Sequence, residues 1–204
     1  TAPDFWLYLG LEVGLGGHID RQNSRWEEFF IPSELTEAIA EFEIEGDAGR
    51  KPLVIEDVML FESTLKAPPE KTGNWWTRYL LLSAFALVLA WLACRFVPFI
   101  TGYGLARAWM VLAGLGGGLL TFFWFFTDHQ AAQRKINLLL LNPAWFVFAF
   151  WRQSRIIGWL LIALSLVALI WGIVPGGQYN LDVLALLMPL NIAAGLAHLK
   201  ASRG

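Results

Sequence analysis

Hydrophobic and polar positions divide this chain into two parts. From residue 79 onward, apolar runs follow one another with short polar interruptions, at 79–99, 106–126, 136–151, 156–174 and 181–199. An α-helix needs about 20 apolar residues to cross a bilayer, so the third run is short for a span. The pattern predicts a mainly α protein, a polytopic α-helical membrane bundle of about five spans.

Residues 1–66 have a different pattern, which is typical of a water-facing segment. In "IPSELTEAIAEFEI", Leu35, Ile39 and Phe42 recur at helical spacing, and glutamates take the outer face. The stretch "KPLVIEDVMLFES" predicts one or two short strands. We therefore expect a small α+β segment ahead of the bundle.

Charge separates the same two parts. Residues 1–77 hold 15 acids and 6 bases, a net charge of −9, whereas residues 78–204 hold 2 acids and 9 bases, a net charge of +7. Five spans place six bases on one side of the membrane, namely Arg95, Arg107, Arg152, Arg155, Lys200 and Arg203. Arg134 and Lys135 are the exceptions, in a loop on the other side. Because cytoplasmic loops carry an excess of Lys and Arg, we expect the α+β segment to be extracytoplasmic and the C-terminus cytoplasmic. If the run 136–151 re-enters the membrane instead of spanning it, the C-terminus moves to the outside.

The boundary between the parts is a linker, "LKAPPEKTGN", followed by the interface signature "WWTR". The opening "TAPDFWLYLGLEVGLGG" shows no signal-peptide pattern and reads as the middle of a longer sequence. We expect three parts: the C-terminal part of a periplasmic soluble domain at 1–66, a linker and interface at 67–78, and a transmembrane helical domain at 79–204.

The stretch "FFTDHQAAQRKINLLLLNPAWF" places polar groups between two apolar runs, on the side of the acidic segment. Two interpretations stay open. Ionisable groups at the edge of a bundle can serve function, so Asp128 and His129 are candidates for a supporting catalytic role. The candidates for substrate or headgroup binding are Arg134, Lys135, Asn137 and Asn142. In the structural alternative, the bases extend to lipid phosphates and the two asparagines cap the short third helix, which breaks at Asn142-Pro143.

Other chemistry finds little support in the residues. His129 and Asp128 are too few ligands for a metal site, so we expect no metal and no cofactor. The single cysteine, Cys94, lies in the apolar run "WLACRFV", and no serine has a histidine neighbour. "GLGGG" lies inside a predicted span, where small residues allow helices to approach closely, and it is not a phosphate loop. The acidic soluble part argues against nucleic acid as a partner.

Two stretches resemble the alternative lipoprotein N-acyltransferases, the Lnb type. The first, "GLGGHIDRQNSRWEEFFIPSEL", resembles the end of the family's periplasmic domain, and the matching residues are Gly16, Asp20, Glu28, Phe30, Pro32 and Leu35. The second, "FFTDHQAAQRKINLLLLNP", resembles a block among its membrane helices, and the matching residues are Thr127, Asp128, His129, Asn137, Leu138, Leu139, Asn142 and Pro143. The sequence departs from that block at Lys135, where the family often has asparagine.

The resemblance implies an enzyme of the bacterial inner membrane that moves an acyl chain from a phospholipid to the free amine of a lipoprotein's lipidated N-terminal cysteine. It implies membrane phospholipid and lipoproteins as partners. The family's catalytic cysteine and histidine motifs match no residue here, so the resemblance implies that they lie upstream of Thr1, in a missing N-terminal part of the same protein. This chain would then have no catalytic residue of its own.

Two other functions compete with this one. A non-enzymatic membrane anchor or scaffold of an envelope protein complex would use the acidic segment for binding and would tolerate changes in the polar stretch. A small transporter or channel subunit would need ionisable groups at mid-membrane and inverted repeats. The last run offers only Asp182, near its start, and the polar but uncharged Asn191, and no repeat is evident.

Overall fold

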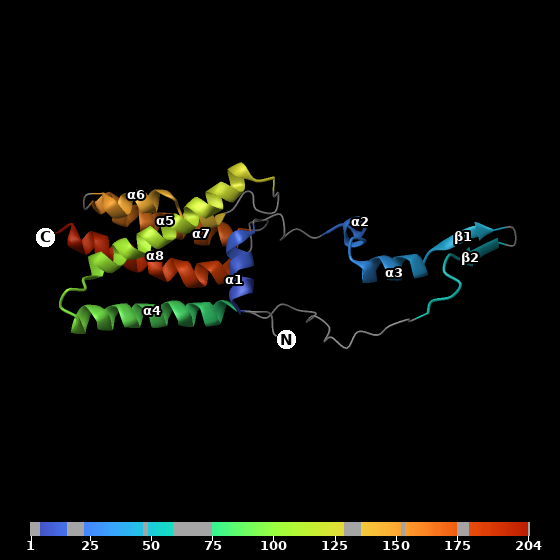
Figure 1. Ribbon diagram of the computed structural model, residues 1–204, viewed down its shortest axis with the longest axis horizontal. Helices are drawn as coiled ribbons and strands as arrows, with labels where there is room; N and C mark the ends of the chain where they lie inside the picture. The colour runs from blue at the N-terminus through green and yellow to red at the C-terminus, as the bar shows by residue number, and fades with distance from the viewer. Residues whose placement is uncertain are drawn as a thin grey trace. The chain divides into compact units, whose positions relative to one another are not determined.

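The structure, a computed structural model, describes residues 5–15, 23–46, 49–58, 75–128, 136–151, 154–174 and 180–203. Contacts divide it into two compact units, and Figure 1 shows the elements of both. Residues 21–69 form one unit, here called the hairpin unit. Residues 2–20 and 70–204 form the other, here called the membrane unit.

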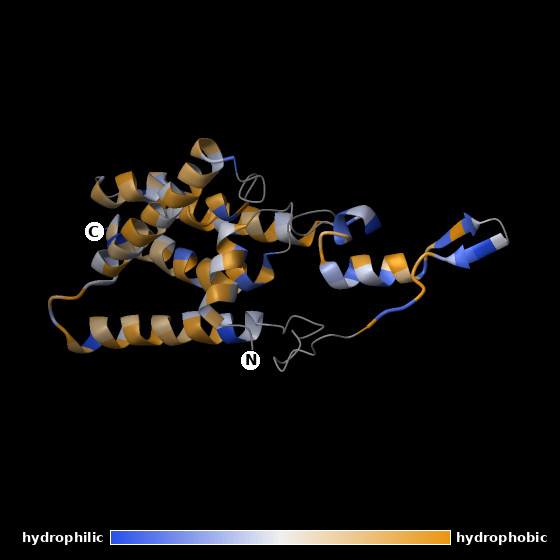
Figure 2. Ribbon diagram, turned by 45° about the vertical axis from the view of Figure 1, so that its right-hand side comes forward, coloured by the Kyte–Doolittle hydropathy of each residue, from blue (hydrophilic) through white to orange (hydrophobic). Residues whose placement is uncertain are grey.

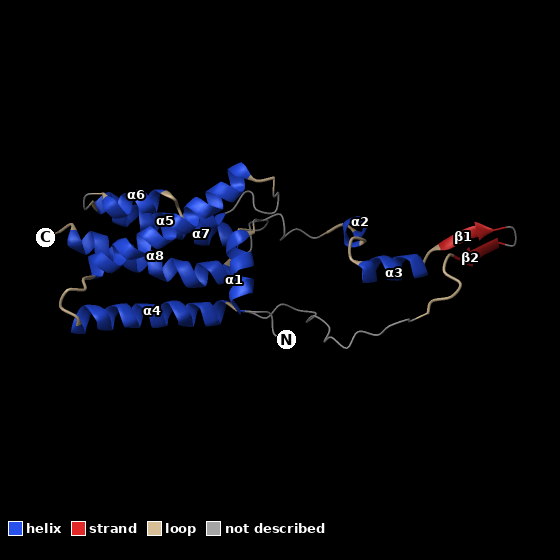
Figure 3. Ribbon diagram, in the orientation of Figure 1, coloured by secondary structure: helices blue, strands red, loops and turns tan. Residues whose placement is uncertain are grey.

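The hairpin unit contains two short helices and two strands (Figure 3). Helix α2, Arg25–Glu28, begins with a capping box in which Ser24 and Glu27 bond each other's backbone N–H groups. Helix α3, Pro32–Ala40, begins on its proline, as the sequence indicates. Strand β1, Glu43–Gly46, pairs antiparallel with β2, Gly49–Pro52, and Gly49 has the positive φ of 105° that favours glycine.

The strand prediction was wrong in its position. The hairpin forms on either side of the turn residues that follow α3, so only the first two residues of "KPLVIEDVMLFES" belong to it. Residues 53–58 are irregular, and 59–63 lie outside the described residues. The turn-forming residues of "EGDAG" determine where the hairpin forms, because they bring the two charged stretches on either side into register although neither has a strong strand propensity.

Helices α2 and α3 bury none of their side chains within the hairpin unit. Trp26 is 81% exposed, Phe30 93% and Ile55 90%. An ion pair at 2.9 Å between Arg25 Nη2 and Glu41 Oε2 is also open to solvent, and such a pair contributes about 0–1 kcal/mol. The described hairpin unit therefore has no apolar core of its own.

Among the described residues of the membrane unit, four helices are long and apolar enough to cross a membrane. They are α4, Trp76–Phe96; α5, Gly102–Phe126; α7, Arg155–Ile173; and α8, Leu181–Ala201. Side chains cap two of them, because Thr101 Oγ1 accepts from Gly104 N at 3.0 Å and Ser154 Oγ accepts from Ile156 N at 3.2 Å. In Figure 2 these helices are mostly hydrophobic along their length, which confirms the predicted membrane bundle.

The third predicted span is a broken helix. It consists of a 3-10 turn, η2, Ile136–Leu139, and a short helix, α6, Ala144–Phe150, with the break at Asn142-Pro143. Its backbone runs along α5: a Cβ on Gly117 would lie 2.7 Å from Leu141 C, and a Cβ on Gly114 would lie 2.7 Å from Phe146 Cα. The glycines of "GLGGG" therefore allow the predicted close approach, and the backbone that packs against them belongs to the broken segment.

Contacts define the two ends of the bundle. Gly102 at the start of α5 approaches Ala197 near the end of α8, and Gly158 in the first turn of α7 packs against Gly195. Arg107 Nε donates to the carbonyl of Ala149 near the end of α6. One end of the bundle therefore contains the end of α4, the starts of α5 and α7, and the ends of α6 and α8. The broken segment, which follows α5 and precedes α7 in the chain, runs from the opposite end of the bundle to this end.

Charge differs between these ends. The described bases after residue 79 lie within two turns of this end, here called the basic end, and they are Arg95, Arg107, Arg155, Lys200 and Arg203. The two acids in the same part of the chain, Asp128 after α5 and Asp182 in the first turn of α8, lie at the opposite end, here called the acidic end. Arg78, in the first turn of α4, is a described base at the acidic end, so the predicted concentration of bases at one end is present in the fold with this exception.

Helix α1, Phe5–Gly14, packs with the membrane helices. In Figure 1 it runs across the acidic end of the bundle rather than along it. The sequence had grouped this stretch with the water-facing residues 1–66. Its composition, "FWLYLGLEVG", suits the interfacial position, because aromatic side chains are favoured where bilayer and water meet.

Candidate functional site at the acidic end of the bundle

The first helical turn of α4 holds the beginning of α1. Tyr79 is fully buried, and its hydroxyl donates to the carbonyl of Phe5 at 3.0 Å. The Phe5 ring lies 4.7 Å from the Tyr79 ring and 5.8 Å from the Trp75 ring, measured between centroids. Aromatic pairs at such distances add to the apolar burial, so this end of α1 is fixed by packing and by one directed hydrogen bond.

Asn137 holds the other end of α1. Its side chain is fully buried, and Nδ2 donates to the carbonyls of Glu12 at 2.9 Å and Val13 at 3.3 Å. These carbonyls belong to the last turn of α1, where the helix offers no N–H partner. Asn137 therefore satisfies acceptors that the end of α1 would otherwise leave buried, and it joins α1 to the start of the broken segment.

The start of α8 completes this arrangement. Asn180 immediately precedes the helix, and its Nδ2 lies 3.5 Å from Asn137 Oδ1, at the limit of a hydrogen bond. Asp182 is buried in the first turn of α8, where the helix dipole favours a negative charge. We call Tyr79, Asn137, Asn180 and Asp182 the α1 cradle.

A second polar contact supports the break in the third segment. Asn191 of α8 donates from Nδ2 to the carbonyl of Leu140 at 3.0 Å and accepts the indole N–H of Trp109 of α5 at 2.8 Å. Trp145 Nε1 also donates to the Leu140 carbonyl, at 3.3 Å. Breaking a helix frees backbone acceptors that lipid cannot satisfy, and these side chains satisfy one of them.

The structure describes three of the six predicted site residues. Asp128 lies exposed just beyond α5, whereas His129, Arg134 and Lys135 lie outside the described residues. Asn142 Oδ1 accepts from the backbone N–H of Ala144, the first residue of α6, at 2.9 Å. Asn137 is engaged with α1. Binding of headgroups or substrate by these residues stays a prediction.

Sequence reasoning missed Tyr79 and Asn180. Each carried a signal that was weak by itself: Tyr79 follows the interfacial tryptophans, and Asn180 occupies the position before a helix where asparagine is favoured. Asp182 stood out as an ionisable residue in a span, but its partners were not visible. The local pattern cannot show that Tyr79 bonds to α1 or that Asn180 lies against Asn137, because these partners are far apart in the chain.

The described residues contain no cluster of three or more His, Cys, Asp or Glu side chains that could hold a metal ion. At the basic end, His198 is fully buried against the ring of Tyr103, 4.8 Å away. Neither ring nitrogen of His198 has a hydrogen-bond partner in the described part of the chain, so Cys94 does not form a thiol–imidazole pair with it. The α1 cradle, with its hydrogen bonds to peptide carbonyls, is suited to positioning a chain segment.

Fold and site together define a polytopic helical membrane protein with an interfacial helix fastened to one end. A family model of the Lnb transmembrane domain matches residues 79–203, more than half of the chain. The chain belongs to this family and is the membrane part of an Lnb-type protein. No curated protein and no solved structure matches the chain.

Proposed function

We propose that this chain is the membrane part of an acyltransferase that moves an acyl chain from phospholipid to lipoprotein. The observation that carries the proposal is the match of the Lnb transmembrane domain to residues 79–203. In the proposed reaction, an ester bond to glycerol breaks and an amide bond to the lipoprotein's N-terminal nitrogen forms, and the nitrogen's proton goes to the released alcohol. The reacting thiol would be supplied by the periplasmic catalytic domain that the resemblance implies.

The α1 cradle gives the membrane part a definite task in such a reaction. Both substrates are held in the bilayer, so the reacting groups must meet them at the level of the headgroups. Tyr79 and Asn137 fix the two ends of α1 on the bundle, and thereby fix the place where the chain leaves the membrane. Misplacement by about 1 Å can lower a rate by two orders of magnitude, so this anchoring supports catalysis through position.

The exposed apolar side chains of the hairpin unit fit the same proposal. Trp26, Phe30 and Ile55 lie open to solvent in the described part of that unit. A larger extramembrane domain would bury them against its own core, which is worth about 1.5–3 kcal/mol for each such side chain. We propose the periplasm for this domain and the cytoplasm for the basic end, because bases are concentrated on the cytoplasmic side of inner-membrane proteins.

The polar stretch after α5 then lies at the outer leaflet. Arg134 and Lys135 would pair with a lipid phosphate, and Asp128 would hold His129 in one tautomer or attract an ammonium group. Asp128→Ala and His129→Ala in the full-length protein test this part of the proposal. Lipoprotein acylation that is unchanged at equal protein levels would remove Asp128 and His129 from the site and leave the cradle's role untouched.

The experiment on the function as a whole expresses the full-length protein in bacterial cells that lack lipoprotein N-acylation. Mass spectrometry of a reporter lipoprotein's N-terminal peptide then measures the acylated fraction. We expect acylation with the wild-type protein and a fall of about tenfold or more with Asn137→Leu, because that change frees the last turn of α1. Ser165→Ala is the matched control, since Ser165 is equally buried but bonds only within α7.

The possible results separate the competing functions. No acylation with abundant wild-type protein would overturn the acyltransferase proposal, and co-purification of a defined envelope protein in that case would favour the scaffold. Acylation that survives Asn137→Leu unchanged would retain the acyltransferase but overturn the positioning role of the cradle. Equal losses with Asn137→Leu and Ser165→Ala would indicate general unfolding of the bundle and would equally contradict a specific role.

A further inference from the structure

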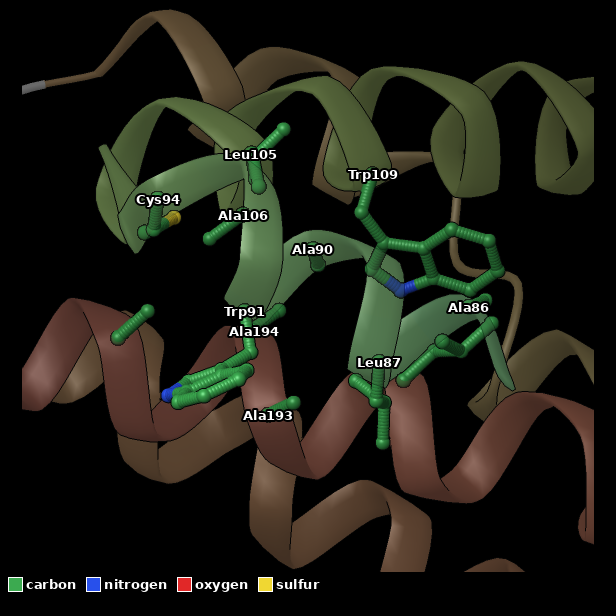
Figure 4. Close-up of a pocket in the computed structure, with 13 residues that line it drawn as sticks. Ala86, Leu87, Ala90, Trp91, Cys94, Leu105, Ala106, Trp109, Ala193 and Ala194 are labelled. Carbon is green, nitrogen blue, oxygen red and sulfur yellow. The ribbon is translucent and has the colours of Figure 1, made fainter. Parts of the chain in front are cut away.

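A groove opens on the side of the bundle between α4 and α5, with α8 as its floor (Figure 4). Its volume is about 300 Å³. The walls come from three helices, and the alanines among them are Ala86, Ala90, Ala106, Ala193, Ala194 and Ala197. In Figure 4 the side chain of Ala90 is seen between the indole rings of Trp91 and Trp109. The groove exists because alanines stand where longer side chains would close it.

The groove is apolar and faces the surroundings of the bundle. The Trp109 indole N–H is already bonded to Asn191, and the exposed thiol of Cys94 is a weakly polar lining group. Most wall residues of α4 and α8 are partly exposed, so the opening leads outward. In a membrane the medium outside is hydrocarbon, and a dry opening of this kind is filled by an acyl chain.

The position of the groove along the bundle selects one leaflet. It extends from Cys94, Gly102 and Ala197 near the basic end to Ala86 and Leu190 further in. The eight residue-to-residue steps of α4 from 86 to 94 span about 12 Å of helix axis, which compares with about 15 Å for the hydrocarbon depth of one leaflet. The groove is therefore as deep as a single acyl chain inserted from the basic end.

The rim of the groove carries the charge that selects a headgroup. Arg95 follows Trp91 by one turn on α4, and Lys200 follows Ala197 by one turn on α8, so both lie on the faces that line the groove. Both are exposed. The acids of the described membrane helices lie at the other end, with Asp182 in the first turn of α8. A lipid whose chain enters the groove thus meets positive charge at its headgroup.

We propose that this groove binds an acyl chain of an anionic glycerophospholipid, whose phosphate lies against Arg95 and Lys200. The site is distinct from the α1 cradle and lies at the opposite end of the bundle. The proposal does not depend on acyl transfer, because it rests on the groove and its basic rim. The bound lipid fills the space that α4 and α5 leave between them.

The test uses the full-length protein in lipid nanodiscs of phosphatidylcholine that contain a small fraction of phosphatidylglycerol with a photoactivatable group in its acyl chain. After illumination, mass spectrometry of peptides locates the attached lipid. We expect attachment concentrated in residues 86–109 and 190–197, and competition by unlabelled phosphatidylglycerol. Arg95→Gln and Lys200→Gln should each lower this attachment about fivefold, the effect of one surface charge on an anionic lipid.

Two matched controls sharpen the result. Arg155→Gln removes an exposed base at the same end, but on α7, which contributes no wall residue, and it should leave attachment unchanged. Ala90→Phe fills the groove and should abolish attachment there, whereas Ala163→Phe, at an exposed position of α7, should not. If Ala90→Phe prevents folding, the comparison of Arg95→Gln and Lys200→Gln with Arg155→Gln still tests whether the groove binds an anionic lipid.

Attachment spread evenly over the lipid-facing residues of all helices would overturn the proposal. Equal competition by phosphatidylcholine would also overturn it, because the basic rim would then select nothing. In a parallel sample, a lipoprotein with a photoactivatable acyl chain replaces the labelled phosphatidylglycerol. Labelling of the groove by the lipoprotein and not by phosphatidylglycerol would also overturn the proposal. None of these results bears on lipoprotein acylation, so the proposed function stands or fails separately.

Discussion

Helix α5 has two sides that solve the same packing problem in opposite ways. On one side, Gly114 and Gly117 receive the backbone of the broken segment with no space left for a side chain. On the other side, Leu105 and Trp109 line an open groove towards α4. In lipid there is no hydrophobic force that presses helices together, so a tight contact forms only where shape and hydrogen bonds support it.

The comparison explains why sequence neighbours are not always packing neighbours. Helices α4 and α5 follow each other in the chain but make few contacts, whereas α4 packs along α8. Ser83 Oγ of α4 lies 3.2 Å from the carbonyl of Ala185 in α8, and Arg107 and Trp109 of α5 bond to α6 and α8. Polar contacts thus fix which helices meet, and small residues without such contacts leave a space for lipid.

The largest effect on the free energy of unfolding is expected from a larger residue on the side of α5 that packs against the broken segment. Gly117→Val would place carbon atoms within 2.7 Å of the Leu141 carbonyl carbon and of Pro143 N. Overpacking costs about 1–3 kcal/mol, and it costs most where the obstacle is backbone. We expect the free energy of unfolding of the full chain, measured by denaturant titration in mixed micelles, to fall by this amount or the protein to fail to fold.

The neighbouring glycine supplies the control for this prediction. A Cβ on Gly118 would meet nothing within 4 Å, so Gly118→Val should change the unfolding free energy by less than about 0.5 kcal/mol. Both variants add the same side chain to the same helix one position apart. Equal destabilisation by the two would mean that valine weakens α5 itself and that the broken segment does not press on Gly117.

A smaller effect is expected from the hydrogen bonds that hold the broken segment to α8. Asn191→Leu keeps the side chain's approximate volume but removes the bonds to the Leu140 carbonyl and to the Trp109 indole. Hydrogen bonds between membrane helices contribute about 0.6 kcal/mol each, and up to about 1.7. We expect a loss of about 1–2 kcal/mol in unfolding free energy in bicelles.

Trp109→Phe separates the two bonds of Asn191, because it removes the indole N–H and leaves the bond to Leu140 in place. The loss should then be about half of that for Asn191→Leu. Should Asn191→Leu prove neutral, the carbonyl of Leu140 would be satisfied by Trp145 Nε1 alone, and Asn191 would have no part in fixing the broken segment.

The two sides of α5 also show what could be predicted from the sequence. Length and hydropathy predicted four continuous spans and a short third one, since these follow from the bilayer's thickness alone. "GLGGG" predicted a close approach, and Asn142-Pro143 predicted a break. The sequence could not show that these two features touch each other, because the pairing of helices depends on contacts between residues that are far apart in the chain.

The α1 cradle illustrates the same limit. Asn137 was singled out as a polar residue at the membrane face, but its partners, the carbonyls of Glu12 and Val13, are backbone atoms that no residue pattern reveals. The groove is a similar case. Alanines at helical spacing are compatible with tight packing as well as with a gap, and the difference lies in how α4 is placed on α8.

The smallest effect is expected on the open side of α5. Ala90→Leu adds three carbon atoms to α4 at a position where the groove has room, so the unfolding free energy should change by less than about 0.5 kcal/mol. The same measurement as for Gly117→Val gives a direct comparison, in which one added side chain meets backbone and the other displaces lipid. If Ala90→Leu destabilised the protein as much as Gly117→Val, α4 and α5 would have to pack closely in the membrane. Close packing of α4 against α5 would leave no space for an acyl chain between these two helices.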